Sequence, residues 1–173
     1  MRNYNFPSIS LYYIIEASKM RKNKKKINPM KIYIAAPLFN EMERSRNLRV
    51  DFMLSSLGHE TYLPQKDAGN AYEIITRNKK MKNKVRKDLF KKDINALNWC
   101  DVILCLFDGR VPDEGTIFEL GYCYAKKKLC FGLKTDDRAM DNMGRDNIMI
   151  EHGISRLFRS ENDLQIFMKT LKK

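Results

Sequence analysis

The sequence predicts an α/β fold, a doubly wound parallel sheet with helices on both faces, and two observations lead to this prediction. Short apolar runs alternate along the chain with longer amphipathic segments, which is the pattern of repeated strand–helix units. The strand candidates are apolar at nearly every position, as expected where both faces of a strand are buried. At 173 residues the chain suits one such domain.

Five apolar runs are the predicted strands. They cover residues 32–36, 59–63, 102–107, 129–133 and 154–158. The first two end at Pro37 and Pro64, because proline lacks the N–H that a sheet ladder needs. Right-handed crossovers between parallel strands then give a flavodoxin-like sheet of about five strands.

Helices are predicted between the strands. They cover about 41–57, 79–98, 116–127 and 161–171, with a loop and short helix at 65–78 and a short turn or helix at 147–151. Asn40 is a suitable N-cap for the first helix, and Gly58 stands where a left-handed C-terminal cap is expected. The residues of this helix that we expect to face inward are Met42, Leu48, Phe52 and Leu57.

The formal net charge of +12 is unevenly distributed. Residues 1–29 hold seven Lys and Arg residues and one Glu, which is half of the net charge. We predict that residues 1–29 are a disordered basic extension and that residues 30–173 form the folded domain, with Met30 as an alternative start. No apolar run approaches the ~18 residues of a membrane helix. The four cysteines form no CxxC pair, which favours reduced thiols in a cytoplasmic protein without a metal site.

The run from Asp113 to Tyr122 (DEGTIFELGY) is the most informative motif. It places carboxylates and two glycines after the apolar strand 102–107, where open α/β sheets bind ligands. Carboxylates around one helix N-terminus can supply a nucleophile and an acid, because their pKa values are pushed apart. Thr116 and Glu119 also fit a capping box, which is a purely structural interpretation.

Two further residues have both a structural and a functional interpretation. Asp93 lies in a lysine-rich helix, where an isolated aspartate is usually a surface ion-pair partner. Tyr33 lies in the first strand, and it belongs either to the core or to the floor of a pocket at the centre of the sheet.

Taken together, the blocks of this sequence resemble the nucleoside 2-deoxyribosyltransferases. The matching blocks are 31–39 (KIYIAAPLF), Asp93 before 100–104 (CDVIL), 113–122 (DEGTIFELGY) and 147–153 (NIMIEHG), within a resemblance over about 31–158. The block 113–122 is the most specific of them. The order and spacing of the others raise the match above that of a lone motif.

The resemblance implies transfer of a 2-deoxyribosyl group between nucleobases through a covalent sugar–enzyme intermediate. It makes Glu119 the nucleophile that attacks C1′, and Tyr33 the residue that positions it. It also implies that Asp113 binds the deoxyribose and that Asp93 contacts or protonates the base. Asn147 is expected to reach into the site of a neighbouring subunit and bind the 5′ end of the sugar.

The same resemblance gives a wider set of expectations. The further substrate-binding residues are Gln65, Gly115, Glu114 and Phe39. Glu114 could also exchange roles with Asp113. The expected partners are a 2′-deoxyribonucleoside, a free nucleobase and other copies of the chain, with no metal, no diffusible cofactor and no membrane.

Two other functions remain open. One is a deoxynucleoside 5′-monophosphate N-glycosidase on the same fold, in which Arg44 and Arg46 would hold the phosphate. The other is a basic nucleic-acid-binding or nucleotide-sensing module without turnover, which would use the lysine-rich segments 21–26 and 79–92. We expect the basic face of the helix at 79–92 to be solvated, and nucleic acid is the less favoured partner.

Overall fold

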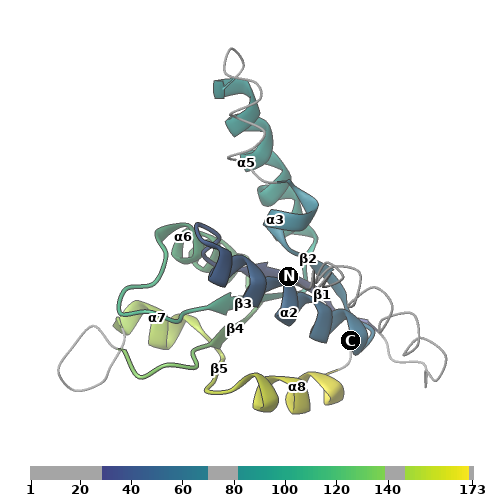
Figure 1. Ribbon diagram of the computed structural model, residues 1–173, viewed down its shortest axis with the longest axis vertical. Helices are drawn as coiled ribbons and strands as arrows, with labels where there is room; N and C mark the ends of the chain where they lie inside the picture. The colour runs from purple at the N-terminus through teal and green to yellow at the C-terminus, as the bar shows by residue number, and fades with distance from the viewer. Residues whose placement is uncertain (1–28, 70–81, 139–146, 172–173) are drawn as a thin grey trace, which may run out of the picture.

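The computed structural model describes residues 29–69, 82–138 and 147–171 (Figure 1). The predicted extension falls outside this part of the chain except for Pro29, so its prediction is untested. The first residues of the helix predicted at 79–98 and much of the predicted loop at 134–146 also fall outside it.

A five-stranded parallel sheet forms the centre of the molecule, in the order β2-β1-β3-β4-β5. The strands are β1 (Lys31–Ala35), β2 (Glu60–Tyr62), β3 (Val102–Leu106), β4 (Leu129–Leu133) and β5 (Arg156–Phe158). β1 and β3 are central, and every residue of β3 is buried. The predicted flavodoxin-like sheet is therefore confirmed.

Helices cover both faces of the sheet (Figure 1). They are α2 (Glu41–Ser56), α3 (Pro64–Asp67), α5 (Lys82–Trp99), α6 (Glu114–Ala125), α7 (Ile148–Gly153) and α8 (Glu161–Thr170). Alternate residues of β1 point to opposite faces, as in any strand. Ile32 and Ile34 pack with α2 and α8, whereas Tyr33 and Ala35 pack with α5, α6 and α7.

The inward face of α2 differs from the prediction. Met42 is 83% exposed and Leu48 is 40% exposed, while Val50 and Leu54 are buried. Of the other residues expected to face inward, Leu57 packs against the core and Phe52 is partly exposed.

Two polar residues occupy buried positions of α2 because each finds partners there. Asn47 donates from Nδ2 to the carbonyl oxygen of Pro37 at 2.8 Å. Asp51 accepts two hydrogen bonds from Lys66 Nζ, at 2.7 and 2.8 Å. Satisfied polar groups can be buried at little cost, so hydrophobicity alone misidentifies this face of the helix.

Among the described residues, the helix α5 is buried only near its C-terminal end. Ala96 and Leu97 are its buried residues, and its N-terminal part extends away from the sheet (Figure 1). The lysines and arginines at its N-terminal end are exposed, as predicted for a solvated basic face. No helix within the described ranges is long and apolar enough to span a membrane.

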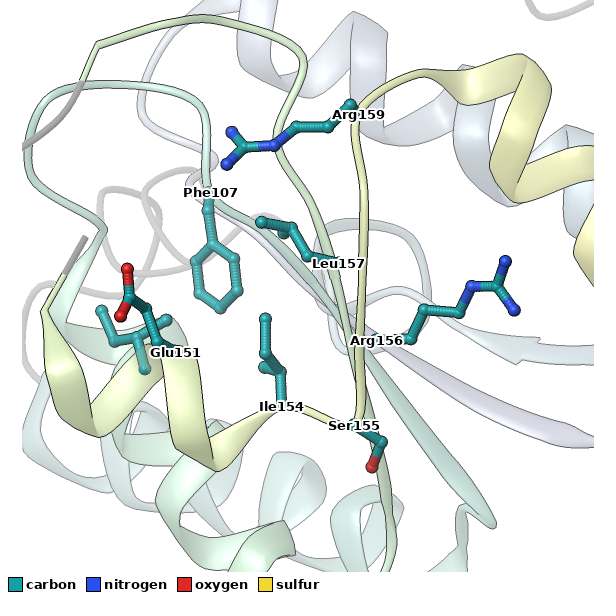
Figure 2. A pocket seen from close by; sticks show the side chains of 8 residues that line it. Phe107, Glu151, Ile154, Ser155, Arg156, Leu157 and Arg159 are labelled. Carbon is teal, nitrogen blue, oxygen red and sulfur yellow. The ribbon is translucent and has the colours of Figure 1, made fainter. Parts of the chain in front are cut away.

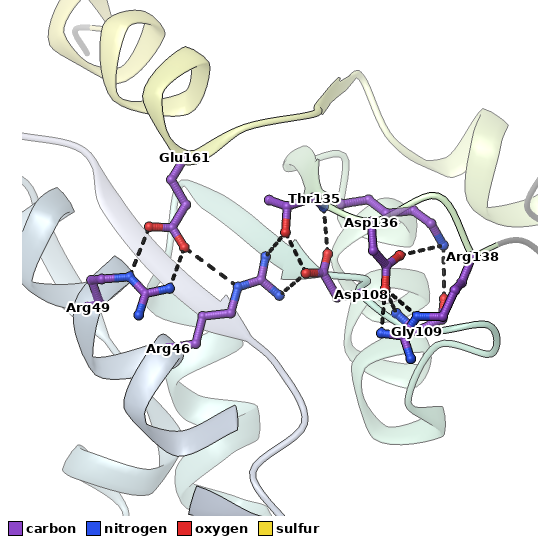
Figure 3. Close-up of polar contacts among 9 residues, drawn as sticks. Arg46, Arg49, Asp108, Gly109, Thr135, Asp136, Arg138 and Glu161 are labelled. Atoms are coloured by element: carbon purple, nitrogen blue, oxygen red, sulfur yellow. Dashed lines mark hydrogen bonds and ion pairs between the residues drawn. The ribbon is translucent and has the colours of Figure 1, made fainter. Parts of the chain in front are cut away.

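A network of ion pairs joins α2, α8 and the loops after β3 and β4 (Figure 3). Arg46 pairs with Asp108 at 2.7 Å, and Asp108 also accepts hydrogen bonds from the backbone N and hydroxyl of Thr135, both at 2.6 Å. Glu161 pairs with Arg49 at 2.8 Å and with Arg46 at 3.7 Å. These contacts fix the loops at the carboxyl edge of the sheet.

His59 makes a second long-range connection near the start of β2. It is buried, and its Nδ1 accepts a hydrogen bond of 3.3 Å from the backbone N of Met30. Since Nδ1 is then the acceptor, Nε2 carries the proton and donates to the Met168 carbonyl at 2.9 Å. The ring therefore joins the residue before β1 to the last helix.

Candidate active site

Tyr33 and Glu119 form a hydrogen-bonded pair on the α5 and α6 side of the sheet. The Tyr33 hydroxyl donates to Glu119 Oε1 at 2.6 Å. Tyr33 is fully buried in β1, and Glu119 lies on α6 beside Leu120, one of the buried residues of that helix. The structure therefore brings together the two residues that the sequence assigned as nucleophile and positioning tyrosine.

Asp113 is the N-cap of α6. Its Oδ2 accepts hydrogen bonds from the backbone N of Thr116 at 2.7 Å and from the Thr116 hydroxyl at 3.1 Å. The capping-box interpretation of Thr116 and Glu119 is therefore wrong, because the helix begins at Glu114 and Thr116 already lies inside it. The Glu119 carboxyl is left to face Tyr33.

Gly115 gives the Asp113 carboxylate the space that it needs. A Cβ atom added at Gly115 would lie 3.1 Å from Asp113 Oδ2, closer than ordinary van der Waals contact. Glu114, between the two, is exposed.

Asp93 is partly buried on α5 and accepts a hydrogen bond of 3.1 Å from the Tyr62 hydroxyl. Its hydrogen-bond partner is thus a tyrosine of the sheet, which argues against the surface ion-pair interpretation. The Tyr62 ring stacks on the Tyr33 ring, with centroids 5.4 Å apart and an interplanar angle of 19°.

Sequence reasoning missed Tyr62. The available signal was the pairing of the first two strands, because a parallel register of β1 and β2 places Tyr33 opposite Tyr62. Residues opposite each other on neighbouring strands share a face of the sheet.

Burial in this site favours the protonated forms of Glu119 and Asp93. Burial raises the pKa of Glu119 to about 8; the Tyr33 hydrogen bond opposes this shift, and the charges of Asp93 and Asp113 add to it. Burial also raises the pKa of Asp93, against the hydrogen bond from Tyr62 and the charge of Lys92. Burial and the neighbouring Glu119 and Asp93 raise the pKa of Tyr33. Two coupled carboxyls of this kind can act as nucleophile and acid.

Gln65, Phe39 and Asn147 are the remaining site residues predicted from the sequence. Gln65 lies in α3, with Nε2 donating to the Arg44 carbonyl at 2.9 Å and Oε1 accepting from Asn47 at 3.0 Å. Phe39 is 74% exposed in the loop after β1. Asn147 is the exposed N-cap of α7, and its Oδ1 accepts from the backbone N of Met149 at 2.9 Å.

Two cavities lie near α7. One, of about 280 Å³, has Phe107, Ile154 and Leu157 along its wall and Glu151 and Arg159 at its sides (Figure 2). The other, of about 400 Å³, lies between α6 and α7 and is mainly apolar. Neither is lined by Tyr33, Glu119 or Asp93.

The described part of the chain contains no group of three or more His, Cys, Asp or Glu residues placed to hold a metal ion. Its four cysteines, Cys100, Cys105, Cys123 and Cys130, are free and buried.

Solved structures with the same fold come from several organisms. A 2-deoxyribosyltransferase from Bacillus psychrosaccharolyticus is 22% identical with a TM-score of 0.61, and the match covers 82% of this chain and 98% of the other. A 2-desoxiribosyltransferase from Leishmania mexicana is 23% identical with a TM-score of 0.61, covering 82% and 99%. A conserved protein from Enterococcus faecalis V583 is 24% identical with a TM-score of 0.64, covering 82% and 98%.

No curated protein matched the sequence significantly. A family model does match, and it is the one described as nucleoside 2-deoxyribosyltransferase. The match covers residues 32–156, which run from β1 to the first residue of β5 and include Tyr33, Asp93 and Glu119. This protein therefore belongs to the nucleoside 2-deoxyribosyltransferase family.

Proposed function

We propose that this protein transfers the 2-deoxyribosyl group of a nucleoside to a second nucleobase, with Glu119 as the covalent nucleophile. The observation that carries the proposal is the 2.6 Å hydrogen bond from the Tyr33 hydroxyl to Glu119 Oε1. This hydrogen bond orients the Glu119 carboxylate through Oε1 and leaves Oε2 available to attack C1′ of the sugar. A buried carboxylate with an anchored orientation is suited to nucleophilic catalysis.

In the first half-reaction, Glu119 attacks C1′ of the deoxyribose and forms an ester bond. The C1′–N bond breaks at the same time, and its electron pair leaves with the base. The base takes a proton from the Asp93 carboxyl and departs neutral. Positive charge builds on the sugar as the bond breaks, and the adjacent carboxylate stabilises it.

In the second half-reaction, a nitrogen of the incoming base attacks C1′ from the face that the first base left. The ester bond breaks, its electron pair returns to Glu119, and the proton of the incoming base passes to Asp93. Two displacements retain the configuration at C1′. Water in place of the base would give free deoxyribose, which we expect as a slow side reaction.

A nucleoside suits this site better than a nucleoside 5′-monophosphate. The two arginines that the sequence suggested for a phosphate already have partners. Arg44 donates to the Leu38 carbonyl at 3.1 Å, and Arg46 pairs with Asp108 and Glu161. A phosphate would have to compete with two carboxylates for Arg46, which weakens the N-glycosidase alternative.

We further propose that the active site is completed by another copy of the chain, with Asn147 reaching into the neighbouring site. Exposed apolar side chains next to Asn147 support this. Met149 is 78% exposed and Tyr124 is 61% exposed, and both line the cavity between α6 and α7. Exposed apolar side chains that line one cavity are typical of a protein–protein contact surface.

The test is a transfer assay with deoxyinosine and free adenine, followed by chromatography. Deoxyadenosine is the expected product, whereas hypoxanthine and free deoxyribose alone would contradict transfer and indicate a hydrolase. Glu119→Gln should abolish turnover, and Glu60→Gln, on the exposed β2 edge, is its matched control. Intact-mass measurement of wild-type protein with deoxyinosine alone should detect one added deoxyribosyl group, absent from Glu119→Gln.

A further inference from the structure

Tyr62 contacts both halves of the catalytic cluster. Its ring lies against Tyr33, which holds the nucleophile Glu119, and its hydroxyl donates to Oδ1 of Asp93. It is thus the residue through which the sugar side and the base side of the site are physically connected.

The fold itself sets up this contact. β2 pairs with β1 so that Tyr62 stands opposite Tyr33, on the face of the sheet covered by α5. Asp93 lies one turn before Ala96 and Leu97, the buried residues of that helix, and is itself only partly buried, whereas Tyr33 is fully buried. Packing therefore holds Asp93 less firmly than it holds Tyr33. The hydrogen bond from the Tyr62 hydroxyl therefore helps to fix the orientation of the Asp93 side chain.

We propose that Tyr62 is a positioning residue that orients the Asp93 carboxyl for proton transfer to the leaving base. The inference rests on the proposed function, in which Asp93 is the acid. Tyr62 occupies Oδ1 alone, and Oδ2 accepts no hydrogen bond from another described residue. A carboxyl held at one oxygen presents the other in a fixed direction, as efficient general acid catalysis requires.

The surroundings of Asp93 show why this hydrogen bond affects its protonation. Glu119 from α6 and Tyr33 from β1 interact with it electrostatically, and Lys92 is its neighbour on α5. Asp67 of α3 acts on Tyr62 itself. The Tyr62 hydroxyl stabilises the charged carboxylate against burial, so it lowers the pKa of Asp93.

Tyr62→Phe is the test, since it removes the hydroxyl and keeps the ring that stacks on Tyr33. Tyr122→Phe is the matched control, because the Tyr122 hydroxyl donates to Asn98 on the same helix α5 at 2.9 Å, from an exposed position. Both variants lose one tyrosine hydroxyl bonded to α5, and only Tyr62→Phe affects Asp93.

Comparing two substrates shows whether Tyr62 positions Asp93 or has a merely structural role. Release of hypoxanthine from deoxyinosine needs a proton, whereas a nitrophenyl 2-deoxyriboside releases a stable anion. We expect Tyr62→Phe to lower kcat about tenfold or more on deoxyinosine and less than about twofold on the nitrophenyl substrate. The kcat/KM profile on deoxyinosine should also shift to higher pH, because the pKa of Asp93 rises without the hydrogen bond. Tyr122→Phe should change neither rate nor profile.

Equal losses on both substrates, or an unchanged pH profile, would overturn the inference and leave Tyr62 a packing residue. Unaltered activity of Tyr62→Phe on deoxyinosine would overturn it too, with the proposed function intact. If wild-type protein releases no base from deoxyinosine, the proposed function is wrong and the inference fails with it. Thermal unfolding of both variants shows whether each is folded.

Discussion

Tyr33 and Glu119, 86 residues apart in the sequence, share a 2.6 Å hydrogen bond between the central strand β1 and the helix α6. The bond stabilises the charged form of a carboxyl that burial would otherwise keep protonated. We therefore expect the protonation of Glu119 to affect both the proposed chemistry and the stability of the protein.

The rate of sugar transfer should depend on the ionisation of Glu119. Burial raises its pKa to about 8, and in the proposed mechanism the carboxylate is the form that attacks C1′. We expect kcat/KM on the nitrophenyl 2-deoxyriboside to rise with pH, with a midpoint near 8, and to level off about one pH unit higher. Asp93→Asn removes a negative charge, so the rise should move to lower pH. A rise centred near the ordinary glutamate pKa in wild-type protein would contradict this assignment.

Tyr33→Phe should shift the rise of kcat/KM with pH to higher pH, opposite to the shift expected for Asp93→Asn. The variant loses the hydrogen bond that lowers the pKa of Glu119, so a larger fraction of the carboxyl is protonated at neutral pH. We expect kcat/KM near pH 7 to fall about tenfold or more, and to recover partly at higher pH. Steady-state kinetics across this pH range measure both effects. A loss that is the same at every pH would point to damaged packing instead.

The stability of the fold should depend on pH through Glu119. Its folded pKa of about 8 exceeds the usual 4.5, so the folded state binds the proton more tightly. This contribution is fully present below the unfolded pKa and is lost as pH rises through about 8, a loss on the order of 5 kcal/mol. Glu119→Gln should therefore gain stability relative to wild type between about pH 5 and pH 9, as measured by urea unfolding. Glu60→Gln should show no such gain.

Gly115→Ala should disturb the sugar side of the site. The added Cβ would stand 3.1 Å from Asp113 Oδ2, so the Asp113 carboxylate must move. We expect a higher KM for the nucleoside and a destabilisation of about 1 kcal/mol from the weakened cap. Gly121→Ala is the control on the same helix, because a Cβ there meets nothing within 4 Å. It should leave KM unchanged and stabilise α6 by up to about 1 kcal/mol.

Arg46→Ala tests whether Arg46 has a structural role or binds a substrate phosphate. Arg46 joins Asp108 to Glu161, and its side chain is only 17% exposed. We expect its loss to lower the free energy of unfolding by about 2 kcal/mol, with KM for deoxyinosine unchanged. Denaturant unfolding and kinetics on nucleoside and 5′-monophosphate measure the two effects. Activity that requires the phosphate and disappears in Arg46→Ala would favour the N-glycosidase.

The sheet could be predicted from the sequence because most of its strands are short apolar runs, and prolines follow the first two, at Pro37 and Pro64. The inward face of α2 could not, because Asn47 and Asp51 are buried through partners in other segments. The cap of α6 was misassigned for a related reason. Asp113 and Thr116 are both good N-caps, and only the helix start at Glu114 decides between them.

The candidate site could also be predicted from the sequence only in part. Glu119, Tyr33 and Asp93 belong to recognisable blocks, and the structure places them in one cluster. Tyr62 belongs to no such block, and its proximity to Asp93 depends on strand register and on where α5 crosses the sheet. These are tertiary properties that a local pattern does not encode.

The bonds of α8 with α2 and with His59 bear on how the chain folds during synthesis. Glu161 bonds to Arg49 across 112 positions, and Met168 bonds to His59 across 109. Leu164 and Met168 fill the core beside Val50 and Leu54. During synthesis, the part of this face that α8 covers therefore stays exposed until α8 has emerged, although α2 can already cover the rest. We expect this transiently exposed apolar surface to favour aggregation or chaperone binding of the nascent chain.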